Sequence, residues 1–321
     1  MGQKLNNYLK NAGGVAHITL DPYGPGVVRV HLVPPEKLKP GIPWVVILNG
    51  QDILPLNTSW AVLLRLFMEE ADEREGYEVD DAEMDLIVAA TVKKAREIFH
   101  QTPEKTLRED LSQIISTLCE IARGEEVTDE IGYMTLAQYA PYMRAPHRMD
   151  LMISAMEKDG AWNCNQQCLH CYAGRQPLAC RKELTTEEWK TVIDRCRKAC
   201  IPQLTFTGGE PTLRDDLPEL VAHAAWFVTR LNTNGILLTE TLCRDLREAS
   251  LDAVQVTLYS DDPAVHNELV GADHFDDTIR GIRNAVAAGL NVSINTPLCT
   301  KNRDWKGLLR LGKELGVRYY T

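Results

Sequence analysis

The sequence predicts an α/β protein whose second half is a partial (β/α)6 TIM-like barrel and whose first half is a smaller α+β domain. From about Asp150 to Thr321, six short apolar runs alternate with amphipathic segments, an order that requires parallel strands joined by right-handed crossovers. In the first half, three apolar runs are followed by three helical patterns. A Pro-containing stretch without periodicity, 139–147, separates the two halves, so we expect domains at 1–147 and 148–321.

The expected strands of the second half are short apolar runs that end in polar residues. They are 149–156, 203–209, 228–235, 253–260, 291–298 and 317–321. The helical patterns between them are 185–201, 217–227, 240–251, 275–290 and 305–316. Thr185 and Thr186 precede Glu187 and Glu188, as in a helix N-terminal capping box, and Gly289 and Gly316 follow helical runs as C-terminal stops. Ligands of such folds bind at the carboxyl ends of the strands.

The first half has a different composition of elements. Strands are expected at 15–21, 27–33 and 43–50, and helices at Ser59–Glu70, Ala82–His100 and Leu107–Arg123. The acidic run 69–85 is interpreted as a solvated helix end and loop, with a landing site for a basic peptide as the alternative.

Composition excludes two classes of partner. The net charge of −10 argues against a general nucleic-acid binder, because binding to phosphate backbones needs clustered Lys and Arg. No stretch is apolar enough for a membrane helix, and the first residues lack the apolar segment of a signal peptide. We therefore expect a cytoplasmic location, with no nucleic-acid or membrane partner.

Three cysteines, Cys164, Cys168 and Cys171, lie in the stretch CNQQCLHCY. One tight loop can turn three sulfurs at this spacing toward a common centre, and soft thiolates bind zinc or iron–sulfur clusters. Zinc would need a fourth ligand, for which His170 is the nearby candidate. A cluster with one open iron fits the spacing better, because a His between two closely spaced cysteines would turn inward with difficulty.

This stretch resembles the signature of the radical S-adenosylmethionine (SAM) superfamily, CxxxCxxC followed by an aromatic residue, here Tyr172. The resemblance implies that the three cysteines hold a [4Fe–4S] cluster and that SAM occupies the remaining iron. It also implies reductive cleavage of SAM to a 5′-deoxyadenosyl radical, which abstracts hydrogen from the substrate. A reductant such as flavodoxin or ferredoxin would supply the electron.

Further residues at expected strand ends agree with the family pattern. LTFTGGEPTL places Gly208, Gly209 and Glu210 after the second strand and matches the family's GGEP motif. Two glycines let the backbone approach a ligand closely, and a carboxylate can accept hydrogen bonds from the SAM ammonium. By the same resemblance, SAM contacts are expected from Asn234, Ser260 and Asn295. One departure is Val270, which stands where related peptide-modifying enzymes often have an Arg.

The resemblance is to the peptide-modifying group, which includes maturases of ribosomal peptides with SPASM or twitch extensions. The first half looks like the winged-helix domain with which several such enzymes bind a leader peptide. The predicted reaction is thus the formation of a thioether, a carbon–carbon crosslink or an epimerised residue. The alternatives are activation of a protein partner, cofactor biosynthesis, and a non-catalytic binding module stabilised by metal.

Two features remain open in the sequence. The chain stops at VRYYT, where a sixth strand ends without a covering helix, so we expect a longer protein with auxiliary iron–sulfur clusters beyond Thr321, if any. Cys180 and Cys299 are thiols without an assigned role, and of these Cys299 is the candidate catalytic residue, as a hydrogen donor or an extra ligand.

Overall fold

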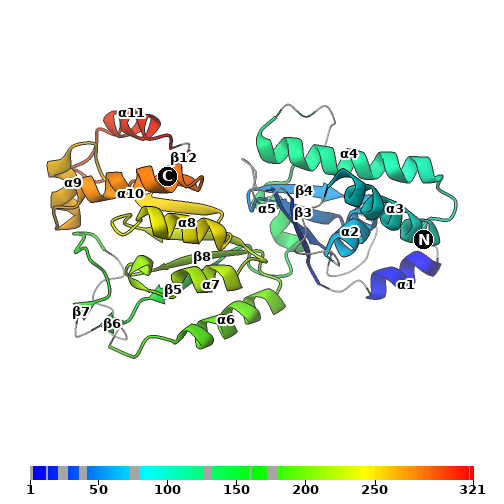
Figure 1. Ribbon diagram of the computed structural model, residues 1–321, viewed down its shortest axis with the longest axis horizontal. Helices are drawn as coiled ribbons and strands as arrows, with labels where there is room; N and C mark the ends of the chain where they lie inside the picture. The colour runs from blue at the N-terminus through cyan, green and yellow to red at the C-terminus, as the bar shows by residue number, and fades with distance from the viewer. Residues whose placement is uncertain are drawn as a thin grey trace. The chain divides into compact units, whose positions relative to one another are not determined.

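The computed structural model forms two compact units, Met1–Pro146 and His147–Thr321 (Figure 1). The residues that the structure describes are 3–11, 14–20, 28–35, 42–72, 80–125, 127, 132–158, 161–171, 180–317 and 319–321. Residues 73–79 of the acidic run lie outside these described residues, and so does Tyr172. No helix within the described ranges is long and apolar enough to cross a membrane.

The N-terminal unit is a four-stranded antiparallel sheet packed against helices. The strands β1 (Ala16–Leu20), β2 (Val28–Val33), β3 (Trp44–Leu48) and β4 (Asp52–Leu56) pair in that order. The helices are α1 (Gln3–Asn11), α2 (Thr58–Asp72), α3 (Asp81–Ile98), α4 (Glu104–Arg123) and α5 (Leu136–Tyr139), followed by a 3-10 turn, Ala140–Tyr142. The antiparallel sheet and the three long helices confirm the predicted α+β class.

The central strands β2 and β3 are buried on both faces, which explains their continuous apolar sequence. One face packs against the apolar sides of α2, α3 and α4. The other face forms a smaller cluster with Tyr139 of α5.

Strand β4 was not predicted as a separate strand. It follows a tight turn at Asn49 and Gly50, both with positive φ. It also contains Pro55, which fits an edge strand. Helix α1 was not predicted either.

The C-terminal unit is a six-stranded parallel sheet, as the alternating pattern predicted. The strands are β5 (Met149–Ser154), β8 (Gln203–Gly208), β9 (Val228–Thr233), β10 (Ala253–Thr257), β11 (Asn291–Asn295) and β12 (Tyr319–Tyr320). They lie in the spatial order β12-β11-β10-β9-β8-β5, and every adjacent pair is parallel. A short hairpin, β6 (Glu157–Lys158) and β7 (Ala161–Trp162), follows β5. This arrangement is the partial barrel that the sequence indicated.

The helices of this unit connect successive strands. They are α6 (Thr186–Lys198), α7 (Leu217–His223), α8 (Glu240–Glu248), α9 (Pro263–Val270), α10 (Phe275–Ala287) and α11 (Lys306–Glu314). Figure 1 shows α6, α7 and α8 following one another along the sheet, and neighbouring helices pack together in this order. The capping box of α6 forms as predicted between Thr185 and Glu188. Helix α9 was not predicted; it is short, and Asp262 caps its start.

The two faces of this parallel sheet differ in chemistry. Leu204, Phe206, Leu231 and similar side chains of the strands are buried under the helices. The residues between them in sequence, such as Thr205 and Asn232, are polar and point to the opposite face because side chains alternate along a strand.

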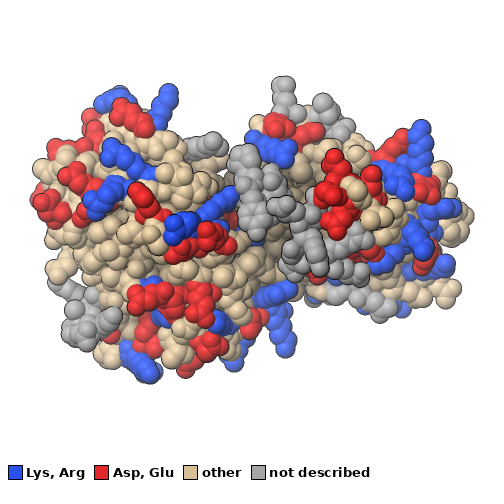
Figure 2. All heavy atoms as spheres, viewed as in Figure 1, with Lys and Arg blue, Asp and Glu red and all other residues tan. Residues whose placement is uncertain are grey.

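Charges of both signs are mixed on the surface. On the side of the molecule shown in Figure 2, Lys and Arg side chains are interspersed with Asp and Glu.

Candidate functional site

The cysteine loop, residues 163–171, is held by backbone hydrogen bonds to the end of α9. Gln167 N donates to Val270 O at 3.0 Å, and Leu169 N donates to Leu269 O at 2.9 Å. Gly271 has a positive φ of 68° and lies so close that a Cβ there would be 2.8 Å from Gln167 O. The backbone carbonyl of Val270 therefore anchors the loop.

The GG pair of the GGEP motif holds the start of the same loop against the sheet. Gly209 N donates to Ser154 O at 3.0 Å, and Glu210 N donates to Asn163 O at 2.9 Å. A Cβ on Gly209 would lie 2.1 Å from Asn163 O, a backbone atom, and Gly208 has a φ of 146° that L residues rarely adopt. Gly209 needs to be glycine because the backbone of Asn163, which leads to Cys164, passes directly over it, and Gly208 because of its positive φ and its close approach to Ser154.

Glu210 is 1% exposed, and its carboxylate joins two strand ends. Oε1 accepts hydrogen bonds from the backbone N–H and the hydroxyl of Thr212 and from the Thr233 hydroxyl, and Oε2 accepts from Asn234 N at 2.8 Å. Burial raises the pKa of Glu210, while these hydrogen bonds act in the opposite direction. The residue predicted to receive the SAM ammonium thus already has partners within the protein.

Asn234 connects this carboxylate to the cysteine loop. Its Nδ2 donates to Asn165 Oδ1 at 2.6 Å and lies 4.0 Å from Cys164 Sγ, while its Oδ1 accepts from Ile236 N. The side chain predicted to contact SAM therefore also orients the first cysteine. Glu210, Asn234 and Cys164 form one continuous chain of contacts.

The three cysteines of the loop are close enough to influence one another's charge. Burial raises the pKa of Cys164 to about 11, and the charges of Glu210, Cys168 and Cys171 act in the same direction. The pKa of Cys168 is also raised, by burial and then by Cys171. Three thiolates in this partly buried, negatively charged loop need positive charge nearby. The three sulfur donors therefore fit a metal cluster, whose iron ions would supply that charge.

The described residues contain no group of three His, Cys, Asp or Glu side chains arranged for a single metal ion. His170, the candidate fourth zinc ligand, packs its ring edge-on against Tyr259, with centroids 4.9 Å apart. Buried polar atoms without a partner in the described structure lie on the loop and below it, at Gln166 Nε2 and Ser154 Oγ. Such atoms fit a site that binds a further group.

The remaining predicted residues each have a protein partner. Ser260 Oγ accepts from Asp262 N at 3.1 Å just before α9 begins, and Asn295 Oδ1 accepts from the Thr321 hydroxyl at 3.2 Å. Cys299 packs with Cys168 against Tyr259. The structure thus brings Cys299 beside the cysteine loop, whereas Cys180 is exposed.

Sequence reasoning missed Tyr259 and Gln166. Tyr259 follows β10, is buried, and belongs to the apolar cluster against which Cys168 packs; hydrogen bonding from Tyr259 acts to lower the pKa of Cys168. Burial and the neighbouring thiols raise its pKa. The sequence offered one indication of this role, because Tyr259 directly precedes the predicted site residue Ser260. An aromatic residue at a strand end is nevertheless typical of a core position.

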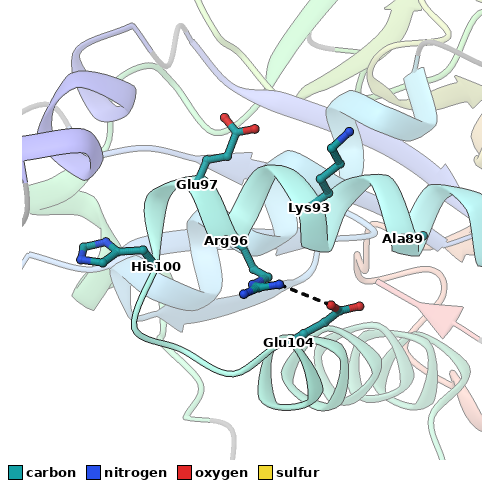
Figure 3. A pocket seen from close by; sticks show the side chains of 6 residues that line it. All are labelled: Ala89, Lys93, Arg96, Glu97, His100 and Glu104. Carbon is teal, nitrogen blue, oxygen red and sulfur yellow. Dashed lines mark ion pairs between the residues drawn. The ribbon is translucent and has the colours of Figure 1, made fainter.

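A separate surface pocket of about 320 Å³ lies in the N-terminal unit, between α3 and α4 (Figure 3). It is lined by Ala89, Lys93, Arg96, Glu97, His100 and Glu104. Arg96 and Glu104 form an ion pair at 3.7 Å, and both side chains are about half exposed, so the pair adds little stability. The pocket contains none of the predicted site residues.

A part of the chain that lies mostly in the C-terminal unit matches known proteins. The sequence model described as "Radical SAM superfamily" matches residues 163–311. The chain is similar to the "Fe-coproporphyrin III synthase" of Methanosarcina barkeri, at 36% identity over 48% of this chain and 40% of the relative. It is also similar to the "PqqA peptide cyclase" of Streptomyces rochei, at 33% identity over 48% of this chain and 43% of the relative.

A third relative is the "Probable GTP 3',8-cyclase" of Methanopyrus kandleri, 38% identical over 43% of this chain and 45% of the relative. The chain therefore spans less than half the length of these curated relatives. Among solved structures, SuiB of Streptococcus suis, crystallised with the precursor peptide SuiA, has a similar fold. Its TM-score is 0.54 at 15% identity, covering 87% of this chain and 59% of SuiB.

We predict that the thiols of the metal-free protein react with iodoacetamide at different rates. With a pKa of about 11 for Cys164, only about one thiol in a thousand is a thiolate at about pH 8, and the thiolate is the nucleophile. The exposed Cys171 and Cys180 should therefore be modified well before Cys164, as followed by peptide mass spectrometry. Below its pKa, the rate at Cys164 should rise about tenfold for each unit of pH. Equal rates for Cys164 and Cys171 at about pH 8 would contradict the partly buried placement of Cys164.

Proposed function

We propose, from the premise that residues 163–311 belong to the radical SAM superfamily, that this chain is a radical SAM enzyme that binds a [4Fe–4S] cluster through Cys164, Cys168 and Cys171. When bound, the cluster and SAM supply reductive cleavage and the hydrogen-abstracting 5′-deoxyadenosyl radical. The observation that carries the proposal is the position of the three thiols. They lie on one loop, fixed from two sides, at the carboxyl ends of parallel strands.

The other residues of the site orient this loop and complete the SAM site. Glu210 Oε2 accepts one hydrogen bond, from Asn234 N, and a carboxylate oxygen can accept two; we assign its remaining lone pair to the SAM ammonium. Ser260 and Asn295 follow β10 and end β11, at the same edge of the sheet, and remain the proposed contacts to the ribose or carboxylate of SAM. Gly209 allows the backbone to pass closely beneath the loop at Asn163, and Gly208 allows its close approach to Ser154.

A peptide is the substrate class that we propose for this enzyme. The fold shared with SuiB favours it, because that likeness covers 87% of this chain and so extends into the N-terminal unit; the similarity to a relative named as a peptide cyclase is consistent with it. In that unit, β1 is at the edge of the sheet, with a strand partner in the described structure only on the β2 side. Strand β4, the other edge, already accepts a hydrogen bond from Met134 N at Ile53 O. A leader peptide would therefore add as a strand beside β1.

Cofactor biosynthesis is the second candidate function. It is supported by the similarity to a porphyrin synthase and a probable GTP cyclase. The similarity to the peptide cyclase has a similar extent, 48% of this chain, so the sequence similarities do not distinguish the substrates. The N-terminal unit is the part of the chain that favours a peptide.

Deoxyadenosine formation tests the proposed activity. We expect the anaerobically reconstituted full chain, supplied with SAM and dithionite, to form 5′-deoxyadenosine. Cys164→Ser, Cys168→Ser and Cys171→Ser should each reduce this product to background, because each removes one of three cluster ligands. Cys180→Ser is the matched control, an exposed thiol outside the triad, and should retain activity. A wild type that binds zinc and forms no deoxyadenosine would reduce the protein to a metal-stabilised binding module.

Hydrogen exchange tests the peptide assignment. A short precursor peptide encoded beside this protein should protect the backbone amides of β1, Ala16–Leu20, because strand addition pairs them. The amides of β3 should not change, since β3 is already paired on both sides. A scrambled peptide of equal composition is the control. The assignment is refuted if the authentic peptide leaves β1 unprotected while a porphyrin or a nucleotide is consumed with SAM.

A further inference from the structure

Cys168 differs from the other two cysteines of the loop because its sulfur lies in a mostly apolar cluster. Leu269, Val270 and Tyr259 form the buried part of that cluster, and Cys168 packs against it. Tyr259 brings a polar hydroxyl into this cluster beside Cys168, and hydrogen bonding from Tyr259 acts to lower the pKa of Cys168 against the effect of burial. Cys171, by contrast, is exposed.

The backbone and the ring of Tyr259 are both fixed in the cluster against which Cys168 packs. Tyr259 N donates to His266 Nδ1 at 3.3 Å, and Tyr259 O accepts from Asn302 Nδ2 at 2.9 Å. The ring contacts His170 on one side and His266 on another, with centroids 4.9 and 6.0 Å away. The side chain is 6% exposed, which leaves little room for another rotamer.

A second buried side chain, Gln166, also reaches this sulfur. It is 5% exposed, and Cys168 Sγ lies 3.7 Å from its Oε1, while its Nε2 has no partner in the described part of the chain. A cysteine that ligates iron is deprotonated and can only accept. A half-turn of the amide, whose oxygen and nitrogen have the same shape, exchanges the two atoms. The orphaned Nε2 then donates to the thiolate, and both groups are satisfied.

We propose that Tyr259 and Gln166 are positioning residues that donate hydrogen bonds to the Cys168 thiolate and raise the reduction potential of the cluster bound there. This inference rests on the proposed function, which places a [4Fe–4S] cluster on the loop. Donors near a cluster sulfur stabilise the reduced state more than the oxidised state, because reduction adds one negative charge. The two side chains would thus ease the transfer of an electron to the cluster without touching SAM.

The test is a redox titration of the reconstituted full-length protein, followed by EPR. Tyr259→Phe removes only the hydroxyl and keeps the ring, and Gln166→Leu removes the amide at similar volume. Tyr320→Phe is the matched control, because its hydroxyl donates to Leu309 O and not to the loop. We expect equal iron and sulfide contents in all proteins and a more negative midpoint potential in the first two. The equilibrium constant for reduction should fall about tenfold per lost bond, which corresponds to about 59 mV for one electron.

The outcomes separate this inference from the proposed function. A wild type that assembles no cluster contradicts both. A wild type with a cluster, and unchanged potentials in Tyr259→Phe and Gln166→Leu, overturns the inference alone. If Tyr259→Phe loses its cluster, Gln166→Leu carries the same test, and a potential equal to the wild-type value overturns the proposal. An equal negative shift in Tyr320→Phe would also overturn it, because the effect would then not arise at Cys168.

Discussion

The buried carboxylate of Glu210 is the contact through which the strand ends and the cysteine loop depend on one another. It accepts hydrogen bonds from Thr212, Thr233 and the backbone of Asn234, and the Asn234 side chain then reaches the loop beside Cys164. A buried charge is costly unless it is fully hydrogen bonded, so these donors and Glu210 require each other. The GGEP motif is therefore a structural junction as well as a proposed cofactor contact.

The cysteine loop is fixed from two sides, and this explains how a short segment can present its sulfurs in defined positions. On one side it is joined to the strand ends through Asn163 and Asn234; on the other, Gln167 and Leu169 pair with the end of α9. Rigid support from neighbouring elements is what a metal site needs to hold its ligands and to tune the metal. The same support brings Tyr259 to Cys168.

Local motifs in the sequence predicted the parallel sheet, the capping box and the cysteine loop, because each depends on residues close in the chain. The partners of Glu210 were not predictable in this way, since Thr233 lies 23 residues further on and its contact exists only once β8 and β9 pair. Strand β4 was missed because Pro55 is unfavourable in most strands, and α9 because eight residues give little periodicity. Tyr259 was missed because its neighbour in the folded chain, Cys168, is distant from it in the sequence.

The proposed site requires a [4Fe–4S] cluster with one iron that SAM can reach, and EPR of the dithionite-reduced full-length protein measures this most directly. The cluster signal should appear in the reconstituted wild type and change in shape and g-values when SAM is added, because SAM would bind the iron that the three cysteines leave open. A cluster signal that SAM leaves unchanged, or a protein that takes up no iron and sulfide, would contradict the assignment of Cys164, Cys168 and Cys171.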